Sequence, residues 1–577
     1  MIGYTIGLYL HKERSEYLHL TPSIYTKSNL PNKQPLKTKD MKRDRKVLMN
    51  TALLAFIAST ALYGQTQYDA ARLIDTDLNG TARFVGMGGA MSALGGDIST
   101  ISTNPAGIGI FRSNDFSTSF SFTDTKTEGM MTGFEKDANR RRMSFDQLGI
   151  VFSNKFGNKT SVRYVNYAIN YHKQRNFSKS MAIYGDLFGA SQTDQIAWMT
   201  NHDVDGSEYP LPLNDYDEIY NNLDGYYYGE DWKDVSWLSV LGIQGGLVGP
   251  EIETDENGQP ILDNEGNTKY TGYYLGIPAY EGEYRSKETG GVNAFDFNIS
   301  ANINERVYLG ATLGFTDVNY NRSSFYTEWG SLNDTDTDYT LENGFKTEGS
   351  GVNLKLGVIW RPIESSAFRV GAAIHTPTYY KLTDKYWASL YSYVDDMEYN
   401  GSTDIAVLDY ELITPWKFNL SLGHTLGTSV AIGAEYEYTD YSAATLRYSD
   451  GFEMKNENQI IDEDLKGMHT LRLGVEAKLI PQLSLRAGYN FSSAAFEKSA
   501  YKYLYPNDMR TDTEYENMLQ RNTFTFGVGY RSSSFYTDIA YKLATQKSTF
   551  YPFDTTESSA DMKCERSQIM LTLGCRF

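Results

Sequence analysis

The chain has 577 residues, a formal net charge of −19 and a mean hydropathy of −0.46. Aromatic residues make up 14% of it, including 45 Tyr, and there are 50 Gly. Nucleic acid is not an expected partner of so acidic a chain. This composition suits a secreted all-β adhesin. It equally suits a membrane β-barrel, in which only every second strand residue meets lipid.

The first 64 residues carry a secretion signal that begins late. Met41 is followed by a basic cluster at 42–46, an apolar run at 47–62 and small residues near the end of that run. This order is typical of a signal peptide, and the apolar run is short for a spanning helix. We therefore predict a signal peptide over 41–64 and interpret 1–40 as a spurious or extra leader.

Residues 65–112 precede the first predicted strand and are rich in Gly and Ala. The stretch is long enough to fold into the lumen of a barrel. It contains the segment 80–109, which reads GTARFVGMGGAMSALGGDISTISTNPAGIG. Its asparagine–proline step favours a turn, because proline fixes φ and lacks a backbone N–H.

From residue 113 onward the side chains alternate between two faces, as they do in strands. At the C-terminus, Ile569, Leu571, Leu573, Cys575 and Phe577 share one face. About fourteen such strands are expected. They lie near 113–123, 145–156, 160–176, 291–304, 306–322, 346–361, 366–384, 410–426, 428–445, 466–480, 483–497, 521–532, 535–550 and 566–577.

The connections between these strands alternate between short and long. The long ones occupy 124–144, 177–290, 323–345, 385–409, 446–465, 498–520 and 551–565. Short turns at one rim and long loops at the other are typical of an outer-membrane barrel. We therefore predict an all-β fold over 113–577, a transmembrane antiparallel barrel with 65–112 as an N-terminal plug inside the lumen. A β-sandwich is the alternative.

The connection 177–290, expected to be extracellular, is too long to lack structure of its own. It contains an apolar run at 237–248, which reads WLSVLGIQGGLV. Trp237, Leu238, Leu241 and Ile243 of this run are candidates for capturing an apolar ligand. The run also fits a small core for a folded loop, and the sequence leaves both interpretations open.

Several charged residues fall on the strand faces predicted to line the lumen. The cations are Lys417, Arg472, Lys478 and Arg486, and Glu435, Glu437 and Glu476 share these faces. They could pair with one another in a solvated lumen, or a cation could receive a ligand carboxylate. The sequence offers little sign of a catalytic or metal-binding site, because the histidines are widely spaced and no Gly-x-Ser-x-Gly element occurs. We predict no catalytic residue, no metal site and no cofactor.

The stretch 80–109 resembles the N-terminal plug of the FadL/TodX-type outer-membrane transporters of hydrophobic compounds, a family with some members labelled haemin receptors. The matching positions are the glycine-rich 86–90, an acidic residue and an Asn-Pro-Ala-Gly tetrapeptide. The resemblance extends to the signal peptide, the strand count and the terminal Phe577, the expected contact with the barrel assembly machinery. It implies that these residues form the plug or gate: Gly86, Gly88, Gly89, Asp97, Asn104, Pro105, Ala106 and Gly107.

The resemblance implies passive transport of hydrophobic small molecules, such as long-chain fatty acids or aromatic hydrocarbons, across a Gram-negative outer membrane. The expected partners are the ligand, outer-membrane lipid and lipopolysaccharide, whose phosphates could meet Arg140, Arg141 and Arg142. Two other functions stay open. One is a plugged barrel in protein secretion or surface attachment, and the other is an outer-membrane lipid hydrolase.

Overall fold

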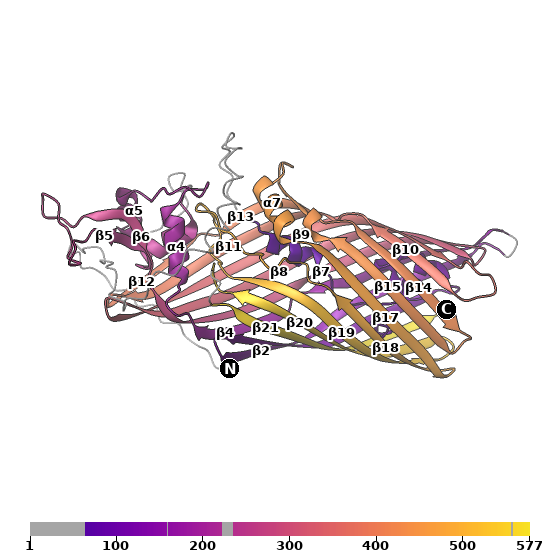
Figure 1. Cartoon of the computed structure of the whole chain (residues 1–577). Helices are drawn as coiled ribbons and strands as arrows, with labels where there is room; N and C mark the ends of the chain where they lie inside the picture. Colours follow the sequence, from indigo (N-terminus) through magenta and orange to yellow (C-terminus); the bar gives the residue numbers. More distant parts are fainter. Residues whose placement is uncertain (1–63, 158–159, 222–234, 555–557) are drawn as a thin grey trace, which may run out of the picture.

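The computed structural model describes residues 64–157, 160–221, 235–554 and 558–577. The predicted leader and signal peptide lie outside the described residues, apart from Gly64. Strands dominate the described chain and form one long closed barrel (Figure 1). Within these ranges, no helix has both the length and the apolar character needed to cross a membrane.

Fourteen antiparallel strands make the barrel wall, and four of them are interrupted along their length. In chain order they are β1 (Asp115–Met131), β2 (Phe134–Lys155), β3 with β4 (Val162–Asn176, Lys179–Asp186), β7 (Ala279–Ile303), β8 (Val307–Leu332), β9 (Thr335–Trp360), β10 with β11 (Arg369–His375, Tyr379–Val394), β13 with β14 (Ala406–Ile413, Lys417–Leu426), β15 with β16 (Val430–Asp440, Thr445–Tyr448), β17 (Gly467–Ile480), β18 (Leu483–Ser492), β19 (Tyr515–Arg531), β20 (Phe535–Tyr551) and β21 (Ala560–Arg576).

Pairing of the first strand with the last closes the barrel. β1 pairs with β21 from Asp115↔Arg576 to Met130↔Asp561. Just before β1, Asn114 exchanges backbone hydrogen bonds of 3.1 and 3.3 Å with Phe577. The predicted fourteen-stranded barrel is therefore confirmed, and the sandwich alternative is wrong.

The predicted alternation of faces is also observed in the wall. On β21, Ile569 and Leu571 are 56% and 38% exposed on the outside, whereas Met570 and Thr572 are fully buried inside. Similar rows of exposed Phe, Leu and Tyr run along the other strands. A wall with an apolar outside and a polar inside is what lipid on one side and a filled lumen on the other require.

Three of the predicted long loops, 124–144, 323–345 and 385–409, are wrong, because they are mostly strands. β1 and β2 run through most of 124–144 and turn at Thr132 and Gly133, which have positive φ. β8 and β9 likewise fill 323–345 and turn at Asn333 and Asp334. Polar residues occupy both faces of these extensions, since they rise beyond the apolar belt. The alternation that reveals a strand is therefore lost there. A shorter strand, β12 (Met397–Ser402), pairs with β11 in the same way within the predicted loop 385–409.

The predicted loop 177–290 is shortened by β4 and β7 and folds as a small lid. The name lid denotes residues 187–221 and 235–278. It contains α4 (Gln192–Asn201), α5 (Leu213–Asn221), α6 (Trp237–Gln244), β5 (Gly249–Ile252) and β6 (Tyr270–Leu275). It sits at the long-loop end of the barrel, on the left in Figure 1. Nearby, α7 (Lys455–Asp464) lies between β16 and β17 in the chain.

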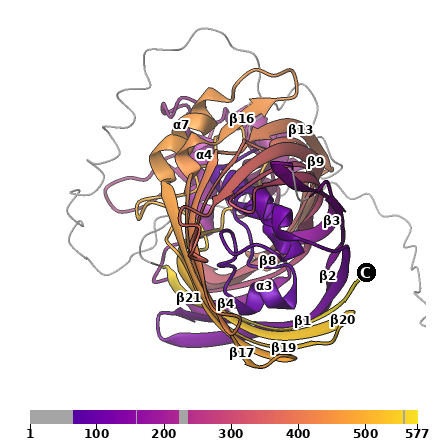
Figure 2. The same cartoon turned by 90° about the vertical axis from the view of Figure 1, so that its right-hand side faces the viewer.

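The N-terminal segment lies inside the barrel, and we call residues 65–112 the plug. It contains α2 (Gln67–Ile74), α3 (Ala82–Gly86) and the 3₁₀ turns η1 (Ile98–Ser102) and η2 (Pro105–Ile110). Seen along the barrel from the short-turn end, α3 is enclosed by the ring of strands (Figure 2). Nearly all plug side chains are buried. The plug therefore fills the lumen at the level of the apolar belt.

Candidate functional site

The glycine-rich stretch of the plug touches the barrel wall with its backbone. Gly88 has φ +63°, and a Cβ on it would lie 2.9 Å from the carbonyl oxygen of Leu473 and from the amide nitrogen of Tyr489. On the wall, a Cβ on Gly488 would lie 2.2 Å from the nitrogen of Gly88. Glycine is required on both sides of this contact. Gly86 and Gly89 flank Gly88 in the same close-packed stretch.

Asp97 holds the plug together from within. Its carboxylate accepts hydrogen bonds from the Thr81 hydroxyl at 2.8 and 2.9 Å and from the Ser99 amide at 3.0 Å. The Thr81 hydroxyl in turn accepts a bond from the Phe84 amide and caps α3. Asp97 therefore joins the start of α3 to the start of η1.

The Asn-Pro-Ala-Gly tetrapeptide attaches η2 to the wall. The Asn104 side chain caps η2 by accepting from the Ala106 amide at 3.1 Å and donates to the Val358 carbonyl of β9 at 3.2 Å. The Pro105 carbonyl accepts a 2.8 Å bond from Ser300 of β7. A Cβ on Gly107 would instead meet Thr100, so this glycine packs within the plug. Whether these residues gate transport stays a prediction.

Buried ion pairs also fix the plug to the wall. Arg83 of α3 donates two 3.0 Å bonds to the two carboxylate oxygens of Glu476. Glu476 also accepts a 2.6 Å bond from Arg486, whose second partner is Asp538, again at 2.6 Å. Farther along the lumen, Asp75 and Asp77 of the plug pair with Arg175, Arg521 and Arg566.

Of the four cations predicted to line the lumen, two are already paired with carboxylates. Arg472 bonds to Glu435 and Glu437, and Arg486 bonds to Glu476 and Asp538. For these two arginines, the alternative in which the charged side chains of the lumen pair with one another is therefore the correct one. Lys478 is exposed near the short turn after β17, because its strand continues past the plug. Lys417 reaches the plug, with its Nζ 3.4 Å from the Ile74 carbonyl oxygen.

A cavity of about 190 Å³ lies between the plug and the wall. Plug residues Thr76 to Asn79 and Ser102 and Thr103 form one side of it. The charged side chains lining it are mostly basic: Arg175, Lys179, Lys355, Lys417, Arg472, Arg521, Lys542 and Arg566, against Asp77, Glu437 and Glu516. In the described chain, Lys417 and Lys542 donate to backbone carbonyls rather than to carboxylates, and the bond of Lys542 goes to the Leu78 carbonyl at 2.8 Å.

Sequence reasoning missed most of these lining residues. Lys355 pairs with Asp296 at 2.9 Å, and His172 lies 3.5 Å from the same carboxylate. His375 bonds to the carbonyl of Thr103 at 2.9 Å. The alternation along each strand predicts that these side chains point into the lumen. It does not predict how far along the barrel axis each of them meets the plug. The described residues contain no group of three or more His, Cys, Asp or Glu able to hold a metal ion.

The cavity extends to a break in the wall. The regular ladder is interrupted between β13 and β14 over residues 414–416, and between β10 and β11 over residues 376–378. Hydrogen bonds still join the two interruptions, because the Thr414 amide donates to the Thr378 carbonyl at 3.1 Å and the Thr378 amide donates to the Thr414 hydroxyl at 2.8 Å. Each break contains a proline, Pro415 or Pro377, which cannot donate to a ladder. Pro415 lines the cavity, and the next residue, Trp416, is exposed on the outside. At this point a few residues separate the cavity from the outer surface of the barrel.

Above the plug, a buried ionic cluster connects it to the segment between β18 and β19. Arg510 of that segment is almost fully buried and bonds to Asp69 of α2 and to Asp512. Lys502 also pairs with Asp512, at 2.8 Å, and Arg322 of the wall pairs with Asp512 and Glu514. This layer separates the cavity from the lid.

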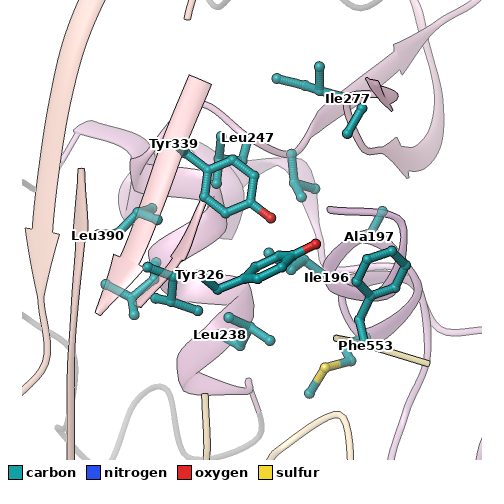
Figure 3. Close-up of a cluster of buried hydrophobic side chains, with 14 of the residues drawn as sticks. Ile196, Ala197, Leu238, Leu247, Ile277, Tyr326, Tyr339, Leu390 and Phe553 are labelled. Atoms are coloured by element: carbon teal, nitrogen blue, oxygen red, sulfur yellow. The ribbon is translucent and has the colours of Figure 1, made fainter. Parts of the chain in front are cut away.

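The lid closes the long-loop end by packing an apolar core against the inside of the wall (Figure 3). Leu238, Leu241 and Ile243 of α6 are buried in this core together with Tyr326, Tyr339 and Leu390 of the wall strands. Trp237 is half-buried and packs instead against a second apolar cluster, which contains Ala70 of the plug and Tyr386 of the wall. The run 237–248 is thus the core of a folded loop, as one interpretation held. Its leucines present no open surface for ligand capture in this conformation.

One buried carboxylate joins the lid to the wall. Glu328 of β8 accepts bonds from the Ser191 hydroxyl at 2.5 Å, the Gln192 amide at 2.8 Å and the Tyr326 hydroxyl at 2.7 Å. Ser191 and Gln192 begin α4, so a wall side chain satisfies the first amides of a lid helix. Burial raises the pKa of Glu328 to about 7, although these bonds oppose the rise.

Comparison with known proteins agrees with this architecture. Residues 279–576 match the family described as "Outer membrane protein transport protein (OMPP1/FadL/TodX)". Similar solved structures include a Pseudomonas aeruginosa FadL homologue, at 12% identity and a TM-score of 0.46 over 87% of this chain and 98% of that chain. No curated protein sequence matches the chain.

Two further solved structures are toluene transporters. Pseudomonas putida TodX has 10% identity and a TM-score of 0.44, over 87% of this chain and 100% of that chain. Ralstonia pickettii TbuX has 11% identity and a TM-score of 0.42, over 87% and 99%. The family match covers most of the barrel wall and more than half of the sequence. The chain therefore belongs to the OMPP1/FadL/TodX family of outer-membrane transport proteins.

Proposed function

We propose that this protein is a passive outer-membrane channel for hydrophobic small molecules. The observation that carries the proposal is the plug. It fills the lumen of a family barrel and leaves a cavity of about 190 Å³ beside it. Water-filled passage is blocked at this level, so a solute must occupy the cavity and move part of the plug. The long-loop end, with the lid, would face the outside of the cell.

The interrupted wall beside the cavity offers an apolar ligand an exit once the hydrogen bonds between Thr414 and Thr378 open. A ligand that passes Pro415 and Trp416 leaves a polar lumen and enters lipid. Each buried CH₂ contributes about 0.8 kcal/mol to that transfer, so no energy source is needed. This position supports sideways release between the interrupted strands, rather than passage through the plug to the short-turn end.

The charge of the cavity favours long-chain fatty acids over plain aromatic hydrocarbons as the ligand. Lys417 and Lys542 donate to plug carbonyls, those of Ile74 and Leu78. An ammonium has three donors, so each lysine could also bind a carboxylate. A hydrocarbon would gain nothing from these two buried ammonium groups, whereas a carboxylate would accept charge-assisted hydrogen bonds from them.

The test is uptake of a labelled fatty acid by cells that carry Asn104→Ala with Pro105→Ala. The first change removes the bond to the Val358 carbonyl and the second removes the ring that fixes φ at the start of η2. We expect uptake to rise several-fold because the plug moves more easily. Asn257→Ala with Pro260→Ala, in an exposed hairpin of the lid, is the matched control and should leave uptake unchanged. Normal uptake by the first variant, with the same amount of folded barrel, would remove the plug from the mechanism.

A contact with lipopolysaccharide remains a prediction. Arg141 and Arg142 are exposed on the extension of β2, and Arg141 also pairs with Asp124 at 2.9 Å. Their position beyond the apolar belt suits contact with outer-leaflet phosphates.

A further inference from the structure

Five aromatic side chains lie together on the surface at the long-loop end. Trp198 and His202 come from the end of α4 in the lid, and Tyr501, Tyr503 and Tyr505 come from the segment between β18 and β19. Trp198 is 36% exposed and Tyr501 is 43% exposed. We call these five residues the aromatic corner. Two separate parts of the chain therefore build one exposed aromatic surface.

The rings of the corner stand at right angles around Tyr503. Its ring makes interplanar angles of 74° with Trp198, 85° with Tyr501 and 89° with Tyr505. The centroid separations from Tyr503 to Trp198 and to Tyr501 are 6.1 and 6.5 Å. Perpendicular rings at such separations can both present a face to one group, which would then lie within about 6 Å of each centroid.

Local structure holds these rings in place. Along 501–505 the tyrosines alternate with Lys502 and Leu504, whose side chains are buried. Lys502 is anchored by its pair with Asp512. On the lid side, His202 stacks on Trp198 at 4.5 Å, and its Nδ1 lies 2.8 Å from the Trp198 carbonyl oxygen. The corner is therefore preorganised rather than a set of loose surface rings.

Two carboxylates flank the corner. Asp205 lies in the turn after His202 and accepts a 2.8 Å bond from the Ser207 amide, and Asp554 is tied to α4 by a 3.1 Å bond from its amide to Gln195. Burial raises the pKa of Tyr503 most, and the neighbouring Tyr501 and the charges of Asp554 and Asp205 raise it further. Both carboxylates therefore act electrostatically on Tyr503, the central ring of the corner.

We propose that the aromatic corner, with Asp205 and Asp554, is a binding site for an organic cation of the quaternary ammonium type. Ring faces carry negative potential and attract such cations, Trp most strongly, and the carboxylates add to the attraction. An uncharged apolar ligand would gain only from contact with the rings. This site lies outside the lumen, and the inference does not depend on the proposed transport.

The experiment compares choline with its uncharged isostere 3,3-dimethylbutan-1-ol. The full protein is held in maltoside micelles, since choline and amine-oxide detergents would occupy the site. Binding is followed by titration calorimetry and by saturation-transfer NMR. We expect choline to bind at least about tenfold more tightly than the isostere, as desolvated cation–π contacts predict. Equal binding of the two, or no binding of choline, would overturn the proposal.

Variants then test whether choline binds at the aromatic corner. Trp198→Leu, a change at an exposed side chain, and Asp205→Asn should each weaken choline binding several-fold. Tyr391→Leu removes an exposed tyrosine of β11 that is not part of the corner, and it should leave binding unchanged. If Trp198→Leu and Asp205→Asn bind choline like the unaltered protein, choline binds elsewhere and the proposal is wrong.

Discussion

The plug and the lid both fill the barrel, but different forces hold them. The plug is made of small residues and is fixed to the wall by backbone contacts and by buried pairs such as Arg83 with Glu476. The lid contributes large apolar side chains, such as Leu241, to a core that it shares with the wall. The inside of a membrane barrel is polar, so a segment lodged there meets charged partners as well as small apolar clusters, such as that of Ile98 and Ile108 with Val151. Beyond the membrane, a segment can bring its own core.

The largest test of this contrast is Glu476→Ala, which leaves Arg83 and Arg486 short of a buried partner. Breaking a buried pair in this way typically costs about 3–5 kcal/mol. We expect the free energy of unfolding, measured by denaturant titration in micelles, to fall by this amount. Glu128→Ala removes a half-buried partner of Lys126 and Lys563 at the surface, and it serves as the control, with little change expected. Similar losses in the two variants would mean that the ion pairs do not fix the plug.

Next in size is Leu241→Ala in the lid core. Removing a fully buried leucine costs about 2–5 kcal/mol, and here the loss should fall on the lid alone. Limited proteolysis should cut the lid faster while plug amides keep their protection from hydrogen exchange. Leu262→Ala, at an exposed position of the lid, should change neither. Loss of plug protection in Leu241→Ala would show that the two regions are not independent.

The expected effect of pH on the stability of the closed lid is smaller than that of Leu241→Ala. The pKa of Glu328 rises from 4.5 to about 7 on burial, so the closed lid binds this proton more tightly than the open one. The closed lid is therefore most stable at low pH and loses up to about 3 kcal/mol as the pH rises from about 4.5 to 7. Hydrogen exchange of the first amides of α4 measures the change. Glu328→Gln cannot titrate, and its exchange should lack this dependence.

The smallest expected effect is that of Thr81→Ala in the plug. It removes the cap of α3 and one partner of Asp97. Loss of such a cap costs about 1 kcal/mol. Thr81→Ser keeps the hydroxyl and should restore the free energy of unfolding. If Thr81→Ser were as unstable as Thr81→Ala, the methyl group rather than the hydrogen bonds would matter.

The sequence predicted the barrel because lipid imposes a two-residue period on every strand that it touches. Ile569 and Met570 show how directly that period gives the two faces. Where strands leave the lipid, as β8 does before Leu332, the period disappears and the strand ends could not be predicted. The glycines of 86–90 marked the plug, since close backbone contact leaves a signature in composition.

The candidate site was only partly predictable. The alternation of side chains along each strand correctly placed Lys417, Arg472 and Arg486 on the inner face of the wall. It did not show how far each residue lies along the barrel axis, so the exposed position of Lys478 was not predicted. Partners such as Arg83 with Glu476 are hundreds of residues apart, and no local pattern records them. The run 237–248 could be identified as apolar, but whether it was a surface or a core depended on what covered it.

The seam between β1 and β21 sets an order of events during assembly. The plug directly precedes β1, and Asn114 is hydrogen-bonded to Phe577, the last residue of the chain. The ring cannot seal until β21 has been made, and once sealed it surrounds the plug. The lid is seated across the opposite opening, so a plug added after closure would have to enter from the short-turn end. Wrapping of the wall strands around a plug that is already in position would avoid this threading.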